Sequence, residues 1–155
     1  MSNSMSRMRI SETPPEPYAA MYRLEASIEL GRPLRELIKL RASQINGCAF
    51  CIDMDYQDAR AAGETEQRLY MLAAWRETDL YTERERAALE LCEAVTLITS
   101  GHVPDHVWDQ ARAAFDAREL GQVLFAISAI NTWNRLMIAT RTPAGDYKPA
   151  RRQAA

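Results

Sequence analysis

Apolar residues recur at steps of three and four through most of the 155-residue chain, and this period constrains the fold more than any other feature. In one clear example, Leu34, Leu37, Ile38, Ala42 and Ile45 would share a single face of a helix. No segment of useful length alternates between apolar and polar residues, as a half-buried strand would. The sequence therefore predicts an all-α fold with about seven helices.

Capping and helix-breaking residues divide this pattern into separate helices. Gly31 and Gly63 stand where a helix could end, and Pro33 and Pro104 suit a first helical turn. Thr82 and the glutamate three residues later match a capping box, which opens a helix. The predicted helices cover residues 18–30, 34–46, 48–63, 64–76, 82–98, 104–115 and 120–140.

Length and composition indicate one ordinary domain. The chain is 47% hydrophobic and 26% charged, which is typical of a globular protein with a single core. We place this domain at residues 17–141, between a flexible N-terminal arm (1–16) and a C-terminal tail (142–155) that are both polar and contain proline. The last predicted helix is apolar around much of its circumference, so we expect a central or interface position and a homo-oligomer.

Charge and hydropathy exclude several classes of partner. The net charge of −2 gives no basic patch for nucleic acid or for an anionic membrane. The longest apolar stretch, residues 123–130, is too short to span a bilayer, and the N-terminus has no secretory-type apolar segment. We therefore expect a soluble cytoplasmic protein. In a reducing compartment, a close cysteine pair is more often catalytic or metal-binding than structural.

Such a pair occurs in the segment NGCAFCIDMD. Cys48 and Cys51 would lie on the same side of the first turn of a helix, near enough to close a small disulfide ring. Asn46 is a good N-cap type, and the positive end of a helix favours a thiolate. From spacing alone, redox chemistry, metal binding and simple packing all remain open.

Other candidate ligands and thiols are less promising. His102 and His106 resemble half of a zinc site, but they lie far along the chain from the cysteine pair and flank Pro104. We therefore expect no metal site. Cys92 has no cysteine near it in sequence, and we interpret it as a buried small hydrophobe. Core or interface packing is the favoured interpretation of three tryptophans: Trp75, Trp108 and Trp133.

Two acids could exchange protons with the thiols. Asp55 follows Cys51 by four residues, so it lies on the same helical face and within side-chain reach. Glu36 lies beside the apolar stripe of the preceding helix and would face the start of the cysteine helix in an antiparallel pair. Carboxylates so placed could accept the proton of a thiol or donate one to a leaving oxygen. The alternative is that both are ordinary solvated acids.

Two segments carry a resemblance to a known family. They resemble the alkylhydroperoxidase D-like proteins of the carboxymuconolactone decarboxylase superfamily and read LRELIKLRASQINGCAFCIDMDYQDARAAGETEQRLYMLAAWRE (34–77) and INTWNRLMIATR (130–141). The resemblance implies a helical hairpin that carries the cysteine pair, in trimers or hexamers. It also implies reduction of hydroperoxides in antioxidant defence, with no cofactor.

The resemblance also implies a role for each site residue. In this family a glutamate precedes the first cysteine by twelve residues, the place of Glu36 relative to Cys48. Cys51 would attack the peroxide and Cys48 would then form a disulfide with it, which a thioredoxin-like or lipoyl dithiol protein would reduce. Dipole reasoning alone would instead favour Cys48 as the nucleophile, because it lies closer to the helix start.

Asp55 departs from the family pattern, which has a histidine there. An ionised aspartate would repel the Cys51 thiolate and raise its pKa. We therefore expect a weaker peroxidase than the histidine pattern would give, and we expect Asp55→His to accelerate peroxide reduction. Two other functions remain open on this fold: thiol–disulfide exchange or redox sensing, and the binding of a small molecule without catalysis.

Overall fold

The predicted all-α fold is confirmed. The computed structural model describes residues 6–149, and within them every regular element is a helix. Three short 3-10 helices, η1 to η3, accompany seven α-helices. In chain order they are η1 (Ile10–Glu12), α1 (Pro15–Ser27), α2 (Arg32–Asn46), α3 (Ala49–Ala61), α4 (Glu66–Tyr70), η2 (Leu72–Glu77), α5 (Glu83–Thr96), η3 (Ile98–Ser100), α6 (Asp105–Ala114) and α7 (Ala117–Thr140).

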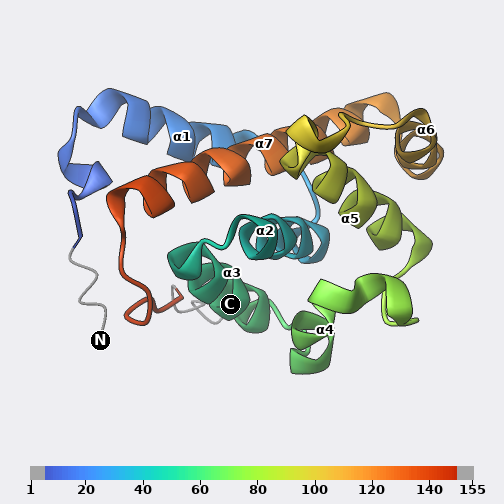
Figure 1. Cartoon of the computed structure of the whole chain (residues 1–155), viewed down its shortest axis with the longest axis horizontal. Helices are drawn as coiled ribbons and strands as arrows, with labels where there is room; N and C mark the ends of the chain where they lie inside the picture. Colours follow the sequence, from blue (N-terminus) through green and yellow to red (C-terminus); the bar gives the residue numbers. More distant parts are fainter. Residues whose placement is uncertain (1–5, 150–155) are drawn as a thin grey trace, which may run out of the picture.

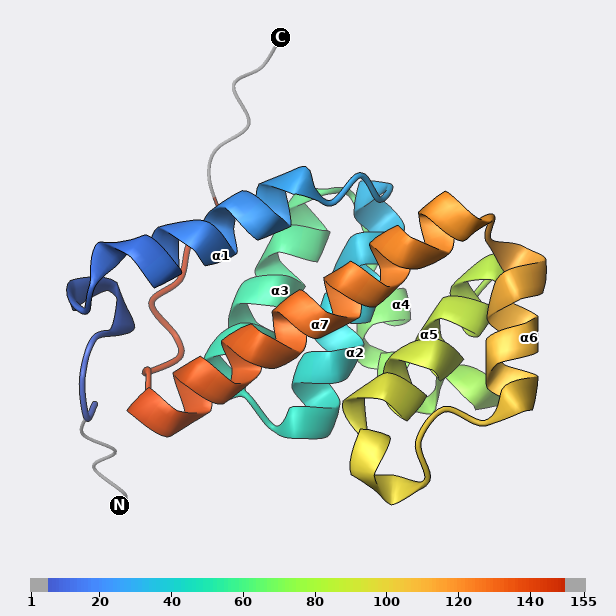
Figure 2. The same ribbon diagram turned by 90° about the horizontal axis from the view of Figure 1, so that it is seen from above.

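Helix α2 lies in the middle of the molecule (Figure 1). It packs against α3, with which it forms the predicted helical hairpin, and against α5 and α7. Figure 2 shows the long helix α7 crossing α2, with α1 beside it and α6 on the far side of α5. This central place explains why α2 buries residues on several faces, charged ones included.

Two apolar cores hold the helices together. The larger core joins α2, α5 and α7, and Ile38, Leu91, Ile127 and Ile130 are fully buried in it. A smaller core lies beneath α4 and η2 around Trp75. The burial of a large aliphatic side chain contributes about 1.5–3 kcal/mol, so these residues supply much of the stability of the bundle.

The turn between α2 and α3 differs from our prediction in one respect. Gly47 has a φ of 69°, a left-handed conformation that favours glycine, and it ends α2. Asn46 is therefore the last residue of α2 and does not cap α3. The N-cap of α3 is Cys48, whose Sγ accepts a hydrogen bond from the Cys51 backbone N–H at 3.3 Å.

Three of the predicted helices also have different bounds. The first, expected at residues 18–30, is α1 at Pro15–Ser27. The helix expected at residues 64–76 divides at Met71 into α4 and η2, and η2 is itself kinked at Ala74, where the backbone leaves the helical region (φ −118°, ψ 30°). Helix α7 begins three residues earlier than predicted, because Asp116 and Glu119 form a capping box. The capping box at Thr82 is confirmed.

The described parts of the arm and the tail lie against the domain. The Arg7 backbone N–H donates to the Thr140 carbonyl at 2.9 Å, and Ile10 packs on the larger core. The Tyr147 hydroxyl donates to Asp58 Oδ1 at 2.7 Å, which places the tail on α3. Residues 1–5 of the predicted arm and 150–155 of the predicted tail lie outside the described residues.

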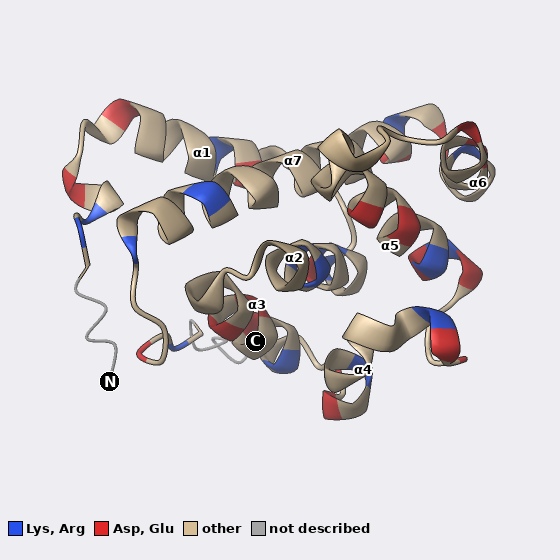
Figure 3. Ribbon diagram, viewed as in Figure 1, with Lys and Arg blue, Asp and Glu red and all other residues tan. Residues whose placement is uncertain are grey.

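Within residues 6–149, none of the helices combines the length and the apolar character that a bilayer crossing requires. Acidic and basic residues are interspersed over the helices, and neither sign gathers on the face shown in Figure 3.

Candidate functional site

The cysteine pair forms a disulfide at the start of α3. The Cα atoms of Cys48 and Cys51 are 5.3 Å apart, and the two residues are 1% and 0% exposed. The pair lies in the larger core, in the first turn of the helix. The geometry thus places both sulfurs where a reversible disulfide can form and where water has little access.

Asp55 lies one turn after Cys51 and is fully buried. Its Oδ2 accepts a hydrogen bond from Ser43 Oγ at 2.9 Å, and its Oδ1 lies 3.2 Å from Lys39 Nζ. Burial raises the pKa of Asp55 to about 6, although Lys39 and Ser43 both favour the ionised form. The interpretation of Asp55 as a solvated surface acid is therefore wrong, and a proton can leave or join it near neutral pH.

Glu36 is buried as well, at 4% exposed. Its Oε2 lies 3.4 Å from Lys39 Nζ, and its Oε1 lies 3.9 Å from Arg35 Nε. The single ammonium group of Lys39 therefore bridges the two predicted carboxylates, one from α2 and one from α3. Burial alone would lower the pKa of Lys39, but Asp55 and Glu36 outweigh this effect and raise it above its usual value.

A network of amides holds the other side of Asp55. Asn134 Nδ2 donates to Ser43 Oγ at 3.0 Å, and Asn134 Oδ1 accepts from Asn46 Nδ2 at 2.8 Å. Asn46 Nδ2 also donates to Asn131 Oδ1 at 2.9 Å. These contacts connect α7 to α2 and to the turn that precedes Cys48.

The direction of this network fixes the role of each Asp55 oxygen. Because Ser43 Oγ accepts from Asn134, its one proton is directed to Asp55 Oδ2. Asp55 Oδ1 is buried and accepts no well-aligned hydrogen bond, although Lys39 lies beside it. A proton carried by Asp55 therefore belongs on Oδ1, on the side of Lys39 and Glu36.

Sequence reasoning missed Lys39, Ser43 and Asn134. Lysine occurs only twice in a chain with 19 basic residues, and one of the two stands three residues after Glu36. That scarcity was a usable signal for Lys39. Ser43 and Asn134 are 91 residues apart and neither differs in type from many surface residues, so local spacing carried no comparable signal.

The remaining candidates lie elsewhere. Burial raises the pKa of Cys92 to about 12, and its thiol donates to the Ile38 carbonyl, as expected of a buried hydrophobe. His102 precedes α6 and His106 lies within it. No group of three or more histidine, cysteine or acidic residues in the described part of the chain could hold a metal ion. Trp75 and Trp133 are buried, as predicted, but Trp108 is 37% exposed.

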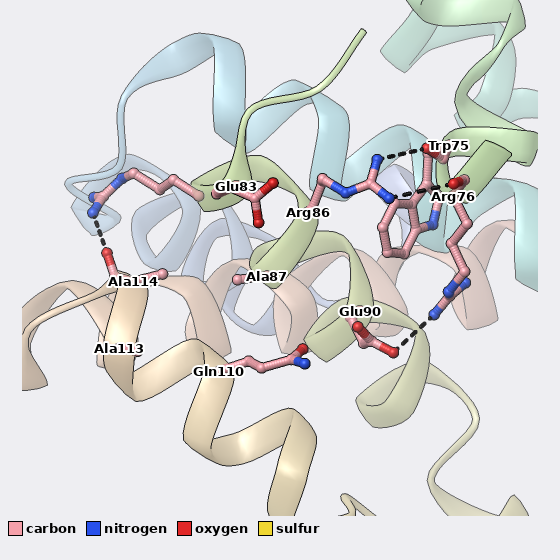
Figure 4. A pocket seen from close by; sticks show the side chains of 10 residues that line it. Trp75, Arg76, Glu83, Arg86, Ala87, Glu90, Gln110, Ala113 and Ala114 are labelled. Atoms are coloured by element: carbon pink, nitrogen blue, oxygen red, sulfur yellow. Dashed lines mark hydrogen bonds and ion pairs between the residues drawn. The ribbon is translucent and has the colours of Figure 1, made fainter. Parts of the chain in front are cut away.

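A surface hollow of about 690 Å³ lies away from the cysteine pair. Figure 4 shows the side chains around it, which come from η2, α5 and α6. Its arginines are already used within the fold: Arg86 donates to the carbonyls of Trp75 and Arg76, and Arg76 pairs with Glu90 at 3.3 Å. This hollow therefore offers little free charge to a ligand, and the candidate site is the buried cluster on α2 and α3.

The model of the carboxymuconolactone decarboxylase family matches residues 15–94, a range that contains the cysteine pair, both carboxylates and Lys39. The chain belongs to the carboxymuconolactone decarboxylase family. This family member is 53% identical over 110 residues to the uncharacterized protein YdfG of Bacillus subtilis, across 71% of this chain and 75% of that protein.

Solved structures share the fold of this family member. A protein of unknown function from Agrobacterium tumefaciens, described as a putative antioxidant defence protein AhpD, is 39% identical with a TM-score of 0.88, over 92% of this chain and 100% of that chain. The debrominase Bmp8 is 18% identical with a TM-score of 0.70, over 84% of this chain and 70% of that chain. At that identity the second likeness shows the fold alone.

Proposed function

We propose that this family member is a thiol-dependent oxidoreductase that reduces small hydroperoxides through a Cys51–Cys48 dithiol/disulfide cycle in antioxidant defence. The observation that carries the proposal is a disulfide at a helix start with the buried carboxylate of Asp55 a single turn after Cys51, linked through Lys39 to a second buried carboxylate, Glu36. The likeness to the Agrobacterium protein, with its putative role in antioxidant defence, supports it.

The cycle needs two bond exchanges. The Cys51 thiolate attacks the terminal oxygen of the hydroperoxide, so an S–O bond forms and the O–O bond breaks. The departing alkoxide takes a proton and leaves as an alcohol, and Cys51 becomes a sulfenic acid. Cys48 then attacks the Cys51 sulfur, so the disulfide forms and the oxygen leaves as water. An external dithiol restores both thiols and is itself oxidised to a disulfide.

Asp55 and Glu36 would move the protons of this cycle. A carboxylate takes the proton of the Cys51 thiol, and the same acid returns it to the alkoxide. Asp55 suits this role because its pKa of about 6 lets it hold or release a proton near neutral pH. Its Oδ1 is the atom that would carry the proton, since Oδ2 is held by Ser43.

The burial of the cysteines favours a small oxidant. Cys51 is 0% exposed in the disulfide form, so a compact hydroperoxide needs less opening of the first turn of α3 than a bulky one. The reducing partner would be a thioredoxin-like or lipoyl-bearing dithiol protein. Helix α7 exposes Phe125 and Ile138, which supports the proposal of a homo-oligomer, trimer or hexamer.

A peroxide-consumption assay with dithiothreitol tests the proposal. We expect turnover in the wild type, a loss of at least about 100-fold in Cys51→Ser, and a trapped sulfenic acid on Cys51 in Cys48→Ser. Cys92→Ala is the matched control, because it removes the third thiol and should turn over like the wild type. Sulfenic acid on Cys48 in Cys51→Ser, with none on Cys51 in Cys48→Ser, would reverse the two roles.

A second function, thiol–disulfide exchange or redox sensing, is favoured by one observation, the formed disulfide itself. In that case the wild type would form the disulfide readily but would show no peroxide turnover. A protein that never oxidises under mild peroxide would instead be a non-catalytic small-molecule binder.

A further inference from the structure

Lys39 is the one buried cation of the site. Its side chain is 10% exposed, and its Nζ lies 3.4 Å from Glu36 Oε2 and 3.2 Å from Asp55 Oδ1. An ammonium group is costly to bury unless opposite charges surround it. A chain that uses arginine at 17 of its 19 basic positions has thus placed a lysine, a compact point charge, between two buried acids, one of which is a single turn from Cys51.

The charges around Lys39 do not balance, and a thiolate at Cys51 would increase the imbalance. Two carboxylates face one ammonium, so ionisation of both leaves one negative charge in excess, and a Cys51 thiolate would add another. Arg35 approaches only Glu36, at 3.9 Å. The other charged or titratable groups that act on Lys39 are Glu25 of α1 and Tyr147 of the tail. Lys39 is therefore the group that offsets negative charge beside Asp55.

The position of Asp55 connects Lys39 to the thiol. Asp55 and Cys51 are four residues apart on α3, and side chains so placed are roughly 6 Å apart. Lys39 reaches position 55 from the neighbouring helix. A cation therefore lies beside the side chain that neighbours Cys51 on α3, even though that side chain is an acid.

We propose that Lys39 is the positioning residue of the thiol site: it holds Asp55 and Glu36 in place and offsets the charge of the Cys51 thiolate, so that α2 supplies the positive charge that a histidine at position 55 could otherwise provide. The inference rests on the proposed function in taking Cys51 as the attacking thiol. It also modifies one expectation. Asp55→His alone should accelerate peroxide reduction less than first expected, because Lys39 disfavours a charged imidazole beside it.

The test measures the alkylation of Cys51 by iodoacetamide as a function of pH in the reduced protein, with mass spectrometry to locate the label. In Lys39→Met we expect the midpoint for Cys51 to rise by about one pH unit, and the rate at pH 7 to fall roughly tenfold. Lys39→Arg keeps the charge and should keep the midpoint within a few tenths of a unit. Lys148→Met is the matched control, because it removes the only other lysine, and it should change nothing.

The decisive variant combines Lys39→Met with Asp55→His. If Lys39 supplies the missing positive charge, the histidine should restore the midpoint in the double variant. An unchanged midpoint in Lys39→Met, or a shift that the double variant does not reverse, would overturn the proposal. Lys39→Gln takes the place of Lys39→Met if circular dichroism shows that the methionine variant does not fold.

This measurement tests the role of Lys39 independently of the proposed peroxidase function. Alkylation reports the charge state of Cys51 whether or not the protein turns over peroxide. A wild type without peroxidase activity but with a Lys39-dependent alkylation profile would overturn the function and retain the role of Lys39.

Discussion

Two charge clusters originate on α2, only two residues apart, and they differ in nearly every respect. Lys39 reaches α3, where it bridges Glu36 and Asp55. Arg41 reaches α5 instead, where its Nε donates to Glu93 Oε1 at 2.8 Å. We call the first the lysine cluster (Glu36, Lys39 and Asp55) and the second the arginine cluster (Arg41, Trp75, Arg76 and Glu93).

The arginine cluster satisfies its carboxylate completely. Trp75 Nε1 also donates to Glu93 Oε1 at 2.8 Å, and Arg76 donates to Oε2 at 2.6 Å. Burial alone would raise the pKa of Glu93, but these three donors outweigh it and lower the pKa below its usual value. The carboxylate stays ionised, so this cluster connects helices and has no proton to exchange.

The lysine cluster has the opposite balance. It contains two carboxylates for one ammonium, and Asp55 Oδ1 accepts no well-aligned hydrogen bond. Burial, with a smaller contribution from the charge of Glu36, raises the pKa of Asp55 to about 6. The comparison shows that deeper burial with fewer donors to the carboxylate separates a group that can transfer a proton from a structural ion pair.

The largest expected effect is a pH dependence that only the lysine cluster has. The pKa of Asp55 is raised from 3.8 to about 6, so its stabilising contribution is present below about pH 4 and is lost as the pH rises through 6. A shift of about two units corresponds to about 3 kcal/mol of the free energy of unfolding. Urea unfolding of the wild type and of Asp55→Asn should show their stability difference changing by that amount between pH 4 and 7.5.

Lys39 does not titrate between pH 4 and 7.5. Because its pKa is raised, its contribution to the free energy of unfolding is lost only above its ordinary pKa of 10.5. The contribution of Glu93 to the free energy of unfolding has the opposite pH dependence. It is present above the ordinary pKa of Glu93 and is lost as the pH falls through its lowered pKa. A stability difference between wild type and Asp55→Asn that does not change with pH would remove the distinction between the clusters.

Glu93→Gln should have the next largest effect. This change keeps the shape of the side chain but removes the charge that Arg41 and Arg76 share, so we expect a loss of about 2 kcal/mol in the free energy of unfolding at pH 7. The alkylation rate of Cys51 should stay within about twofold of the wild type. Asp55→Asn is the matched amide substitution, and it should differ in both respects, with a stability change that depends on pH and a large change in the alkylation rate.

Cys92→Ala should have the smallest effect. Its thiol is fully buried and has a pKa of about 12, so it should stay unlabelled by iodoacetamide in the folded protein. We expect a loss of about 1 kcal/mol in the free energy of unfolding, and no change in Cys51 labelling. Labelling of Cys92 at a rate comparable to that of Cys51 would contradict its assignment to the core.

Much of the fold could be predicted because helices are local. The stripe from Leu34 to Ile45, the stop at Gly47 and the capping box at Thr82 all depend on residues a few positions apart. The break at Ala74 could not be predicted in this way. It depends on burying Leu72 and Trp75 in the smaller core, which is a property of the assembled bundle.

In the candidate site too, local relations could be predicted from the sequence and tertiary contacts could not. The sequence places Asp55 one turn from Cys51, because that relation lies within one helix. Its pKa could not be predicted, because it depends on Lys39 across the hairpin and on an amide network that reaches Asn134 of α7. The N-cap was misassigned to Asn46 because Asn46 still belongs to α2, which the left-handed Gly47 ends, so that Cys48 becomes the N-cap of α3.

The disulfide closes a ring between residues only three positions apart. A loop of this size removes little freedom from the unfolded chain, about 2 kcal/mol compared with nearly 5 for a loop of about a hundred residues. Reduction of this disulfide should therefore cost less stability than reduction of one that closes a long loop. We therefore expect the helical bundle to keep its fold through repeated redox cycles. The two redox states would then differ in the bond between the two sulfurs and not in the helix arrangement.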